Sequence, residues 1–374
     1  MRKLLNVLLV VGFLVIIALP LAANIAGEDG GDQQAENREL AKFPTFEPTW
    51  KSLVAWPDGL DVWFQDHFGF RSTLVQWYGE SRYFGLHVSP SPLVVRGKAG
   101  WLYYADDAGL DDFTNENLLP PGEIDNWRNE IVRARDWCRS HRIAYVFTIL
   151  PDKHVIYPEN FDDAVVQLTP VSRADQVFTA TLDTGVVVDV RQPLLAAKAQ
   201  DRLFQKTDTH WNERGAFLAY QQIIDAVHRQ LPAVPPARDR SMFNATSQML
   251  SGRDLAAIIG LKWVLGEEDL QLLPKKPSAY VVVEPPGSYA TAGEGRIVTE
   301  IPGSTLPRAV IFRDSFTSAL APYLSEHFSR VVYLWQNNFD ADEVLKEHAD
   351  VVIEEIVGRH LHNFIPSPEL IPDP

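Results

Sequence analysis

An aspartate and a histidine, Asp208 and His210, stand two residues apart, with Trp211 directly after them. On an extended loop such residues point to the same side, so the carboxylate can accept from one imidazole nitrogen and leave the other free as a base. A helix predicted over 213–229 follows this loop. The spacing therefore allows an acid–base pair; the alternative is a helix cap, at Asp208 or Asn212, beside a surface histidine.

A base needs a nucleophile, and Ser315 is the candidate. It follows an apolar strand predicted over 308–312 and stands at the start of a helix predicted to run through residue 327. A strand-to-helix turn presents a hydroxyl at the carboxyl edge of a sheet, where backbone N–H groups and the helix N-terminus can stabilise an oxyanion. The alternative is that Ser315 or Asp314 only caps the helix.

Short apolar runs and amphipathic segments alternate along the chain and form the scaffold for these residues. Runs of strand length are predicted at 143–150, 186–190, 280–283, 308–312, 331–335 and 351–354, a hairpin at 93–104, and helices at 123–141 and 213–229. This alternation predicts an α/β fold with helices on both faces of the sheet. In such folds ligands bind at the carboxyl ends of the strands.

The charge and the rare residue types exclude several classes of function. A formal net charge of −15 repels phosphate backbones, which argues against nucleic-acid binding. Cys138 is the only cysteine, so an intramolecular disulfide is impossible, and its place in a predicted helix favours a small buried side chain. The histidines lack ligand spacing, and His360 with His362 is better explained as surface. We predict no metal and no cofactor.

The N-terminus predicts export. Arg2 and Lys3 precede an apolar run of about 20 residues, enough to cross roughly 30 Å of hydrocarbon as a helix. The positive residues remain in the cytoplasm, so the body lies outside it. We favour an uncleaved anchor over a cleaved signal peptide, because no clean cleavage site follows the run. We therefore divide the chain into an anchor or signal (1–27), a flexible tether (28–42) and a folded body (43–374).

Five segments of the body occur in a distinctive order: 64–71 (FQDHFGFR), 95–104 (VRGKAGWLYY), 151–158 (PDKHVIYP), 208–211 (DTHW) and 355–359 (EIVGR). Their order resembles that of the alginate O-acetyltransferase family of AlgJ/AlgX type, and most closely its shorter, membrane-anchored members. The resemblance implies that the body is an SGNH hydrolase-like acetyltransferase domain. Its fold would be a three-layer sandwich with a mainly parallel sheet and a circularly permuted order of motifs.

The resemblance also implies roles for individual residues. Asp208 orients the imidazole ring, His210 is the base and Ser315 takes the acetyl group. Trp211 is a candidate for the acceptor groove, and Lys153 and Tyr157 of the segment 151–158 are candidate substrate contacts.

The segment before the serine departs from the family pattern. The alginate enzymes usually have Gly-Thr there, and this chain has Arg313 and Asp314. Arg313 is a candidate contact for an anionic sugar group; the alternative, which we favour, is an ion pair with Asp314.

The resemblance implies an O-acetyltransferase that acts on an exported polysaccharide, alginate or a similar polymer, through an acetyl-serine. A domain outside the cytoplasm cannot use cytosolic acetyl-CoA, so a membrane acyl-donor protein and other export subunits are expected partners. The expected location is the periplasmic face of the inner membrane, or the periplasm after cleavage. The alternatives are a polysaccharide acetyl esterase and a non-catalytic polysaccharide-binding subunit.

Overall fold

The computed structural model describes residues 2–25, 39–106, 108–282 and 295–374. The chain divides into two compact units. The first comprises Met1–Arg96 and Ser251–Gly266, and the second comprises Gly97–Leu250 and Glu267–Pro374. Most of the expected tether, 28–42, lies outside the described residues, and the boundaries expected at residues 27 and 42 stay predictions.

The first unit is mainly helical. Its elements are α1 (Arg2–Ile25), α3 (Trp50–Asp66), α4 (Arg71–Glu80), a π-helical turn (Ser81–Gly85), β1 (Val94–Arg96) and α11 (Asp254–Ile258). Within α1, the stretch Lys3–Asn24 has a mean hydropathy of 2.9 and is long and apolar enough to cross a membrane. The same composition suits a signal sequence, so the helix agrees with either N-terminal prediction.

The second unit is built on a seven-stranded mixed sheet in the order β4-β3-β11-β9-β10-β8-β7. The strands are β3 (Ala144–Leu150), β4 (Val187–Val188), β7 (Tyr280–Val282), β8 (Arg296–Glu300), β9 (Arg308–Arg313), β10 (Arg330–Trp335) and β11 (Val351–Val357). The first five strands of that order run parallel to one another. β8 pairs antiparallel with both of its neighbours, β10 and β7. β2 (Leu102–Tyr104) and the paired strands β5 (Phe243–Ser251) and β6 (Gly266–Pro274) lie outside this sheet.

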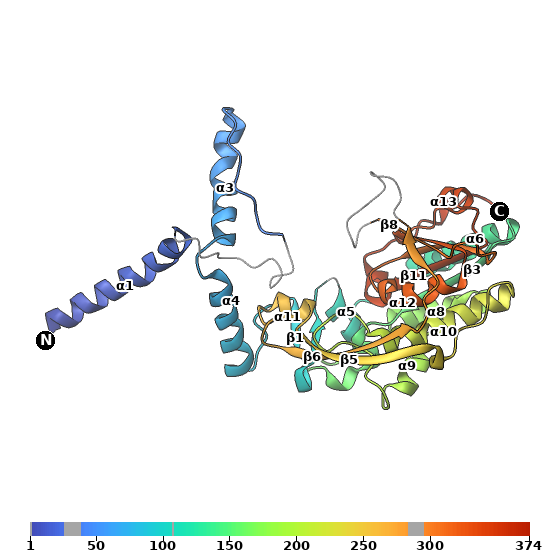
Figure 1. The fold of residues 1–374 in the computed structure, drawn as a ribbon, viewed down its shortest axis with the longest axis horizontal. Coiled ribbons are helices and arrows are strands. Elements are labelled where there is room, and N and C mark those ends of the chain that lie inside the picture. Colours follow the sequence, from blue (N-terminus) through green and yellow to red (C-terminus); the bar gives the residue numbers. More distant parts are fainter. Residues whose placement is uncertain (1, 26–38, 107, 283–294) are drawn as a thin grey trace. The chain divides into compact units, whose positions relative to one another are not determined.

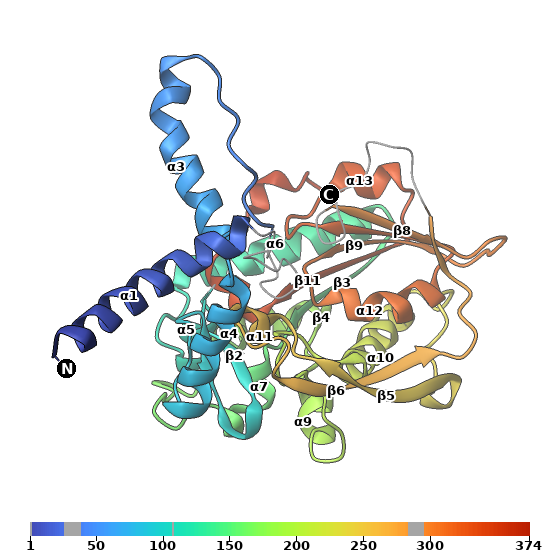
Figure 2. The ribbon, with the colours of Figure 1, turned by 60° about the vertical axis from the view of Figure 1, so that its left-hand side comes forward.

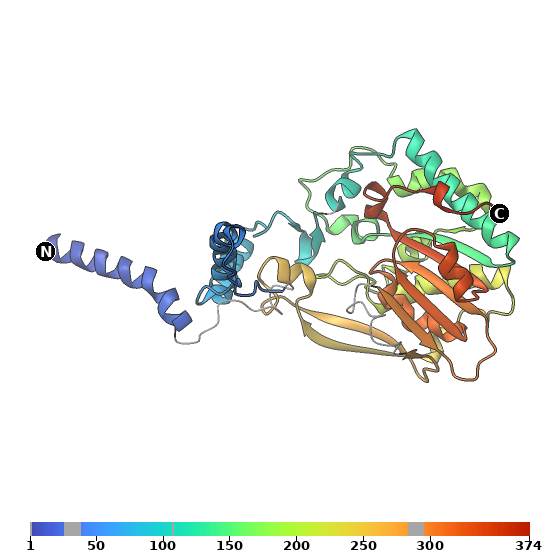
Figure 3. The same cartoon turned by 90° about the horizontal axis from the view of Figure 1, so that it is seen from above.

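Helices cover both faces of the sheet, so the second unit has three layers (Figures 1 and 2). Its α-helices, within the described residues, are α5 (Gly109–Thr114), α6 (Pro121–Ser140), α7 (Lys153–Ile156), α8 (Arg173–Thr181), α9 (Arg191–Ala197), α10 (Glu213–Gln230), α12 (Thr317–Leu324) and α13 (Ala341–Lys346). Figure 2 shows α6 and α13 on one side of the sheet and α10 and α12 on the other. Figure 3 shows the long β5–β6 ribbon separated from the sheet in that view.

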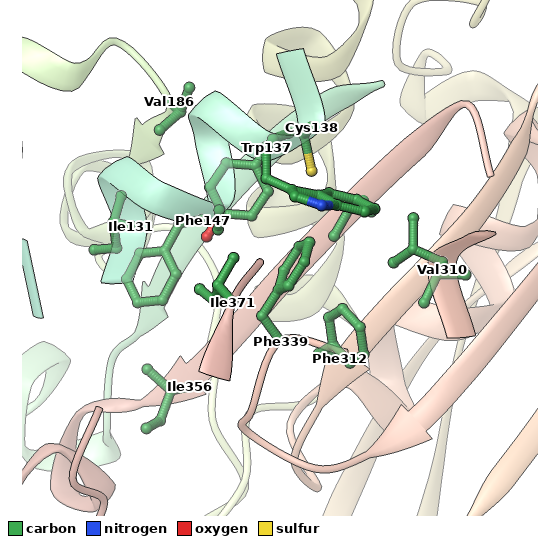
Figure 4. Packing of buried hydrophobic residues seen from close by; sticks show 14 of the residues in the cluster. Ile131, Trp137, Cys138, Phe147, Val186, Val310, Phe312, Phe339, Ile356 and Ile371 are labelled. Carbon is green, nitrogen blue, oxygen red and sulfur yellow. The ribbon is translucent and has the colours of Figure 1, made fainter. Parts of the chain in front are cut away.

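A hydrophobic core lies between α6 and the long apolar strands of the sheet. Trp137 of α6 and Phe312 of β9 both pack against Phe339, with ring centroids 5.4 and 5.6 Å apart (Figure 4). Cys138 is fully buried beside them, as its helical position predicted. Large aromatic side chains contribute most of the apolar area that such a core removes from water.

The predicted α/β architecture is confirmed, and the predicted strands lie within a few residues of the observed ones. Three of the observed strands, β5, β6 and β8, were not predicted. β8 begins and ends in charged residues, and β5 is rich in polar residues, so neither resembles a buried strand. Their partner strands, and not their own composition, decide their conformation.

Candidate active site

The two predicted sequence signals meet at the carboxyl edge of the sheet. Ser315 lies in the turn between β9, a central strand buried along nearly its whole length, and α12. His210 lies in the loop that leads into α10, whose first turn is capped by the side chain of Asn212. The turn with Ser315 is therefore fixed by the strand before it, and the loop with His210 is fixed by the capped helix after it.

The side chains of Asp208, His210 and Ser315 form a continuous hydrogen-bonded chain. Oδ1 of Asp208 is 2.7 Å from Nδ1 of His210, and Nε2 of His210 is 2.7 Å from Oγ of Ser315. Oδ1 of Asp208 also accepts from the backbone N–H of His210, at 3.0 Å. The carboxylate thus fixes both the backbone and the ring of the histidine, and leaves Nε2 directed at the serine hydroxyl.

The charge of Asp208 suits this arrangement. Burial raises the pKa of its carboxyl group, but the hydrogen bonds and the charge of His210 outweigh burial and bring the pKa to about 2. Asp208 is therefore ionised at any pH near neutrality. An ionised carboxylate at Nδ1 favours the tautomer whose Nε2 is free to accept a hydrogen bond from the Ser315 hydroxyl.

Lys153 holds the loop that carries Asp208 and His210. Its side chain is only 3% exposed, and Nζ donates to the backbone carbonyls of Gln205, Lys206 and Asp208 at 3.0, 3.1 and 2.6 Å. These bonds give Lys153 a positioning role on this loop. Its predicted contact with substrate stays a prediction.

Glu267 holds the same loop through its N–H groups. The carboxylate accepts from the backbone nitrogens of Lys206 and Thr207, at 2.7 and 3.0 Å, and from the hydroxyl of Thr207. It also pairs with Arg202 at 2.8 Å. A buried cation on the carbonyls and a buried anion on the amides thus replace the hydrogen bonds that a strand or helix would provide.

Trp211 connects the loop that carries Asp208 and His210 (the base loop) to the turn that carries Ser315 (the serine turn). Its indole is 3% exposed, and Nε1 donates to the backbone carbonyl of Phe316 at 3.1 Å. The Phe316 ring packs against both Trp211 and His210, with centroids 5.3 and 5.0 Å away. Through these contacts the buried indole supports the turn that carries Ser315. The predicted place of Trp211 in an acceptor groove stays a prediction.

Two buried carboxyl groups, those of Asp314 and Glu355, fix the backbone of the serine turn by hydrogen bonds. Asp314 accepts from the backbone N–H groups of Phe316 and Val357, at 2.8 and 2.7 Å. Glu355 accepts from the N–H of Asp314 and the hydroxyl of Thr317. Burial and the neighbouring charge of Asp314 raise the pKa of Glu355 well above its usual range. The raised pKa favours the neutral form of the Glu355 carboxyl group, which lies buried beside Asp314.

The ion pair that the sequence suggested between Arg313 and Asp314 is wrong. Both oxygens of Asp314 accept backbone N–H groups, and Nη1 of Arg313 donates instead to the backbone carbonyl of Asp314, at 3.1 Å. Within the described residues the guanidinium pairs with no carboxylate; it lies over the Trp335 ring at 4.4 Å. Contact between Arg313 and a sugar stays a prediction.

A second ion pair supports the edge of the site. Arg359 donates from its backbone and its guanidinium to Asp152, the residue before Lys153. Tyr157, the remaining predicted contact, is 5% exposed; its hydroxyl accepts from the N–H of Leu203 at 3.0 Å and donates to the carbonyl of Asp201. The hydroxyl thus fixes the segment just before the base loop, and a substrate contact by Tyr157 stays a prediction.

Sequence reasoning did not assign roles to Glu267, Asp152, Glu355 or Arg359. Glu355 and Arg359 belong to the segment 355–359, which carried part of the family resemblance but did not indicate which residues they contact. Glu267 had no signal, because it follows a stretch without helical or strand periodicity. The expected absence of a metal and of a cofactor stays a prediction.

Comparisons with known proteins agree with this fold. A family model described as an SGNH hydrolase-like domain, acetyltransferase AlgX, matches residues 94–291, more than half of the chain. A probable alginate O-acetylase AlgJ from Pseudomonas syringae pv. tomato is 29% identical over 196 residues, 52% of this chain and 48% of that protein. A protein of the same name from Pseudomonas putida is 30% identical over 153 residues, 37% of this chain and 35% of its own length. The chain thus spans about half, or less, of the length of these relatives.

Among solved structures, PatB1 of Bacillus cereus has a TM-score of 0.53 and 16% identity, with 72% of this chain and 96% of PatB1 covered. At this identity the likeness concerns the fold alone. Together with the family match it confirms the predicted SGNH-hydrolase-like architecture.

Proposed function

The chain belongs to the family of SGNH hydrolase-like acetyltransferase domains of AlgX type, and from this premise we propose that it is an O-acetyltransferase that modifies an exported polysaccharide. The polysaccharide would be alginate or a similar polymer, by analogy with relatives named probable alginate O-acetylase. The acetyl group would pass through an ester on Ser315, with His210 as the base and Asp208 as its positioning carboxylate.

One observation carries the proposal: Nε2 of His210 is 2.7 Å from Oγ of Ser315 while Nδ1 is held by an ionised aspartate. A serine hydroxyl is a weak nucleophile until a base within hydrogen-bond reach removes its proton. Asn212 does cap α10, as one alternative held, but a cap beside a surface histidine accounts for neither contact of the His210 ring.

In the first half-reaction, Oγ of Ser315 attacks the carbonyl carbon of an acetyl donor as Nε2 of His210 takes its proton. The tetrahedral intermediate collapses, the bond between the acetyl carbon and the donor's leaving atom breaks, and His210 returns the proton to that atom. The products are an acetyl-serine and the free donor alcohol or thiol.

In the second half-reaction, a sugar hydroxyl attacks the carbonyl carbon of the acetyl-serine. His210 takes the hydroxyl proton, the ester bond to Oγ breaks, and Ser315 recovers its proton from His210. Transfer exceeds hydrolysis only if the bound sugar excludes water from the ester.

The proposed setting follows from α1. With Lys3–Asn24 as a membrane anchor, the site would lie on the periplasmic side of the inner membrane, and its donor would be an acyl group delivered by a membrane protein. Cleavage of α1 would leave the body free in the periplasm without changing the chemistry.

Turnover of a chromogenic acetyl ester tests the reacting residues. We expect Ser315→Ala and His210→Ala to lose at least about 10³-fold in kcat/KM, in line with the loss of a nucleophile or general base. Ser304→Ala, in the turn before β9, and His141→Ala, at the end of α6, are matched controls and should turn over the ester at the wild-type rate. Wild-type turnover by Ser315→Ala would exclude the acetyl-serine.

Product analysis separates transfer from hydrolysis. When the acetyl ester is supplied with a polysaccharide fragment, transfer places acetyl groups on the sugar, whereas an esterase yields acetate alone. Normal acetylation of the polymer in cells that carry Ser315→Ala would instead favour a non-catalytic, polysaccharide-binding subunit.

A further inference from the structure

A cavity of about 480 Å³ lies on the α12 side of the sheet. Its apolar walls come from the end of β6 and the loop after it, from the antiparallel strands β7 and β8, and from α12 and β10: Leu273, Pro277, Val281, Ile297, Pro322 and Tyr333. Among the described residues, neither Ser315 nor His210 belongs to the wall. The volume falls within the range of about 300–1,000 Å³ usual for small-molecule sites.

One cation lies in this apolar wall. Arg313 lines the cavity and is only 2% exposed. It donates two hydrogen bonds, both from Nη1, to the carbonyl of Asp314 and to the hydroxyl of Ser318, at 3.1 and 3.3 Å. Nε and Nη2 have no hydrogen-bond partner in the described parts of the chain. A guanidinium has five N–H donors and stays charged at neutral pH, so this one has unused donors and an unpaired charge.

In the described parts of the chain, the nearby carboxyl groups form no ion pair with Arg313. Asp314 accepts from two backbone N–H groups, and Glu355 accepts from the N–H of Asp314 and the hydroxyl of Thr317. Glu326, which also lines the cavity, accepts from the N–H groups of Ser278 and Ala279 and pairs with Arg238 at 2.9 Å. A buried cation without an ionic partner is costly to a fold and is usually kept for a ligand.

We propose that this cavity binds a small amphipathic anion, with its carboxylate or phosphate group on the guanidinium of Arg313 and its hydrocarbon against the apolar walls. The planar guanidinium, stacked on Trp335 at 4.4 Å, offers Nε and Nη2 as a pair of donors that matches a carboxylate or phosphate edge. The site is separate from the acetyl-transfer site. It nevertheless touches the serine turn, since Ser318, which accepts from Arg313, donates its N–H to the carbonyl of Ser315.

Binding measurements on the full chain in lipid nanodiscs test the proposal. Hexanoate and hexyl phosphate serve as anionic probes, hexan-1-ol as the neutral probe and acetate as the head group without a chain, each followed by saturation-transfer NMR. We expect both anions to bind at least tenfold more tightly than hexan-1-ol, and acetate to bind more weakly than hexanoate. Equal affinity for hexanoate and hexan-1-ol, or no binding of either anion, would overturn the proposal.

Two variants locate the ligand. Arg313→Met keeps the length of the side chain and removes its charge, so the anions should lose at least tenfold in affinity while hexan-1-ol keeps its own. Arg308→Met, at the other end of β9 and paired with Glu347, is the matched control and should bind the anions as the wild type does. The same nanodiscs also correct for partition of the probes into lipid. Equal losses in both variants would contradict the proposed site.

Ile297→Trp provides a second, independent variant, because it fills the apolar part of the cavity without touching the guanidinium. It should weaken all three six-carbon probes, and wild-type affinity in this variant would place the ligand elsewhere. Since the readout is binding and not ester turnover, failure of this proposal is distinguishable from failure of the proposed acetyl transfer.

Discussion

The base loop before α10 and the serine turn after β9 are held in place in different ways. The serine turn continues a buried central strand, and its supports, Asp314 and Glu355, come from the turn itself and the neighbouring strand β11. The loop before α10 is closed at its ends by a single isolated β-bridge between Phe204 and Trp211. Lys153 and Glu267, far from it in sequence, bind its carbonyls and its amides. Ser315 is thus positioned mainly by the sheet, and the loop that carries His210 mainly by side chains distant in sequence.

The largest expected effect is common to both regions. Ser315→Ala and His210→Ala should each reduce kcat/KM for an acetyl ester by about 10³-fold or more, and the double variant should lose little beyond either single one, because the two groups act as one unit. Steady-state kinetics of the three variants measure this. Additive losses would mean that the two side chains act independently, contrary to the 2.7 Å contact between them.

The next effect separates the two regions. Lys153→Met and Glu267→Gln should each lower kcat by roughly 10- to 100-fold with a smaller change in KM, because a displaced base slows proton transfer more than it weakens binding. Sulfonyl fluoride labelling of Ser315 gives a second readout that should slow in parallel. Losses in KM alone would show that these residues bind substrate, as the sequence suggested for Lys153, and do not position the base.

A pH effect tests the link between the helices that follow the two regions. His327, at the end of the α12 segment, is fully buried and hydrogen-bonded to Tyr220 of α10 at 2.7 Å. Burial lowers its pKa to about 4. The unfolded chain therefore binds this proton first as the pH falls, and the stability contributed by the neutral ring is complete above about pH 6.5 and is lost between about 6.5 and 4.

Between pH 7 and pH 5 this loss is about 2 kcal/mol in the free energy of unfolding, a few degrees in Tm. Thermal unfolding of the wild type and of His327→Gln at both pH values measures it. The variant should show a smaller decrease in Tm over this range. An equal decrease in both proteins would mean that other groups carry the pH dependence.

The smallest expected effect concerns the serine turn. Burial and the charge of Asp314 raise the pKa of Glu355 well above its usual range. Glu355→Gln keeps an uncharged acceptor for Asp314 and Thr317, so it should change kcat/KM by less than about threefold. Glu355→Ala leaves those two donors buried without a partner and should cost more in both activity and Tm. If Gln and Ala are equally damaging, the carboxyl group is ionised and the account of the turn is wrong.

The sequence predicted the sheet and the segments that meet at its edge, because long apolar runs and a loop before an amphipathic helix are local patterns. It did not predict the support of the base loop, since Glu267 lies 60 residues from Thr207 in sequence. It also mispaired Arg313 with Asp314, because the N–H of Val357, 43 residues away, competes for the carboxylate. Neighbours in sequence are poor guides to buried polar contacts when distant backbone groups need the same partner.

The central claim is that Ser315 carries the acetyl group. Its most direct test is rapid quenching of the protein during turnover of an acetyl ester, followed by peptide mass spectrometry. We expect an acetyl group on the peptide that contains Ser315 in the wild type, its accumulation when no sugar acceptor is present, and its absence in Ser315→Ala. Continued turnover with no acetyl group on Ser315, or with the group on another residue, would contradict the account.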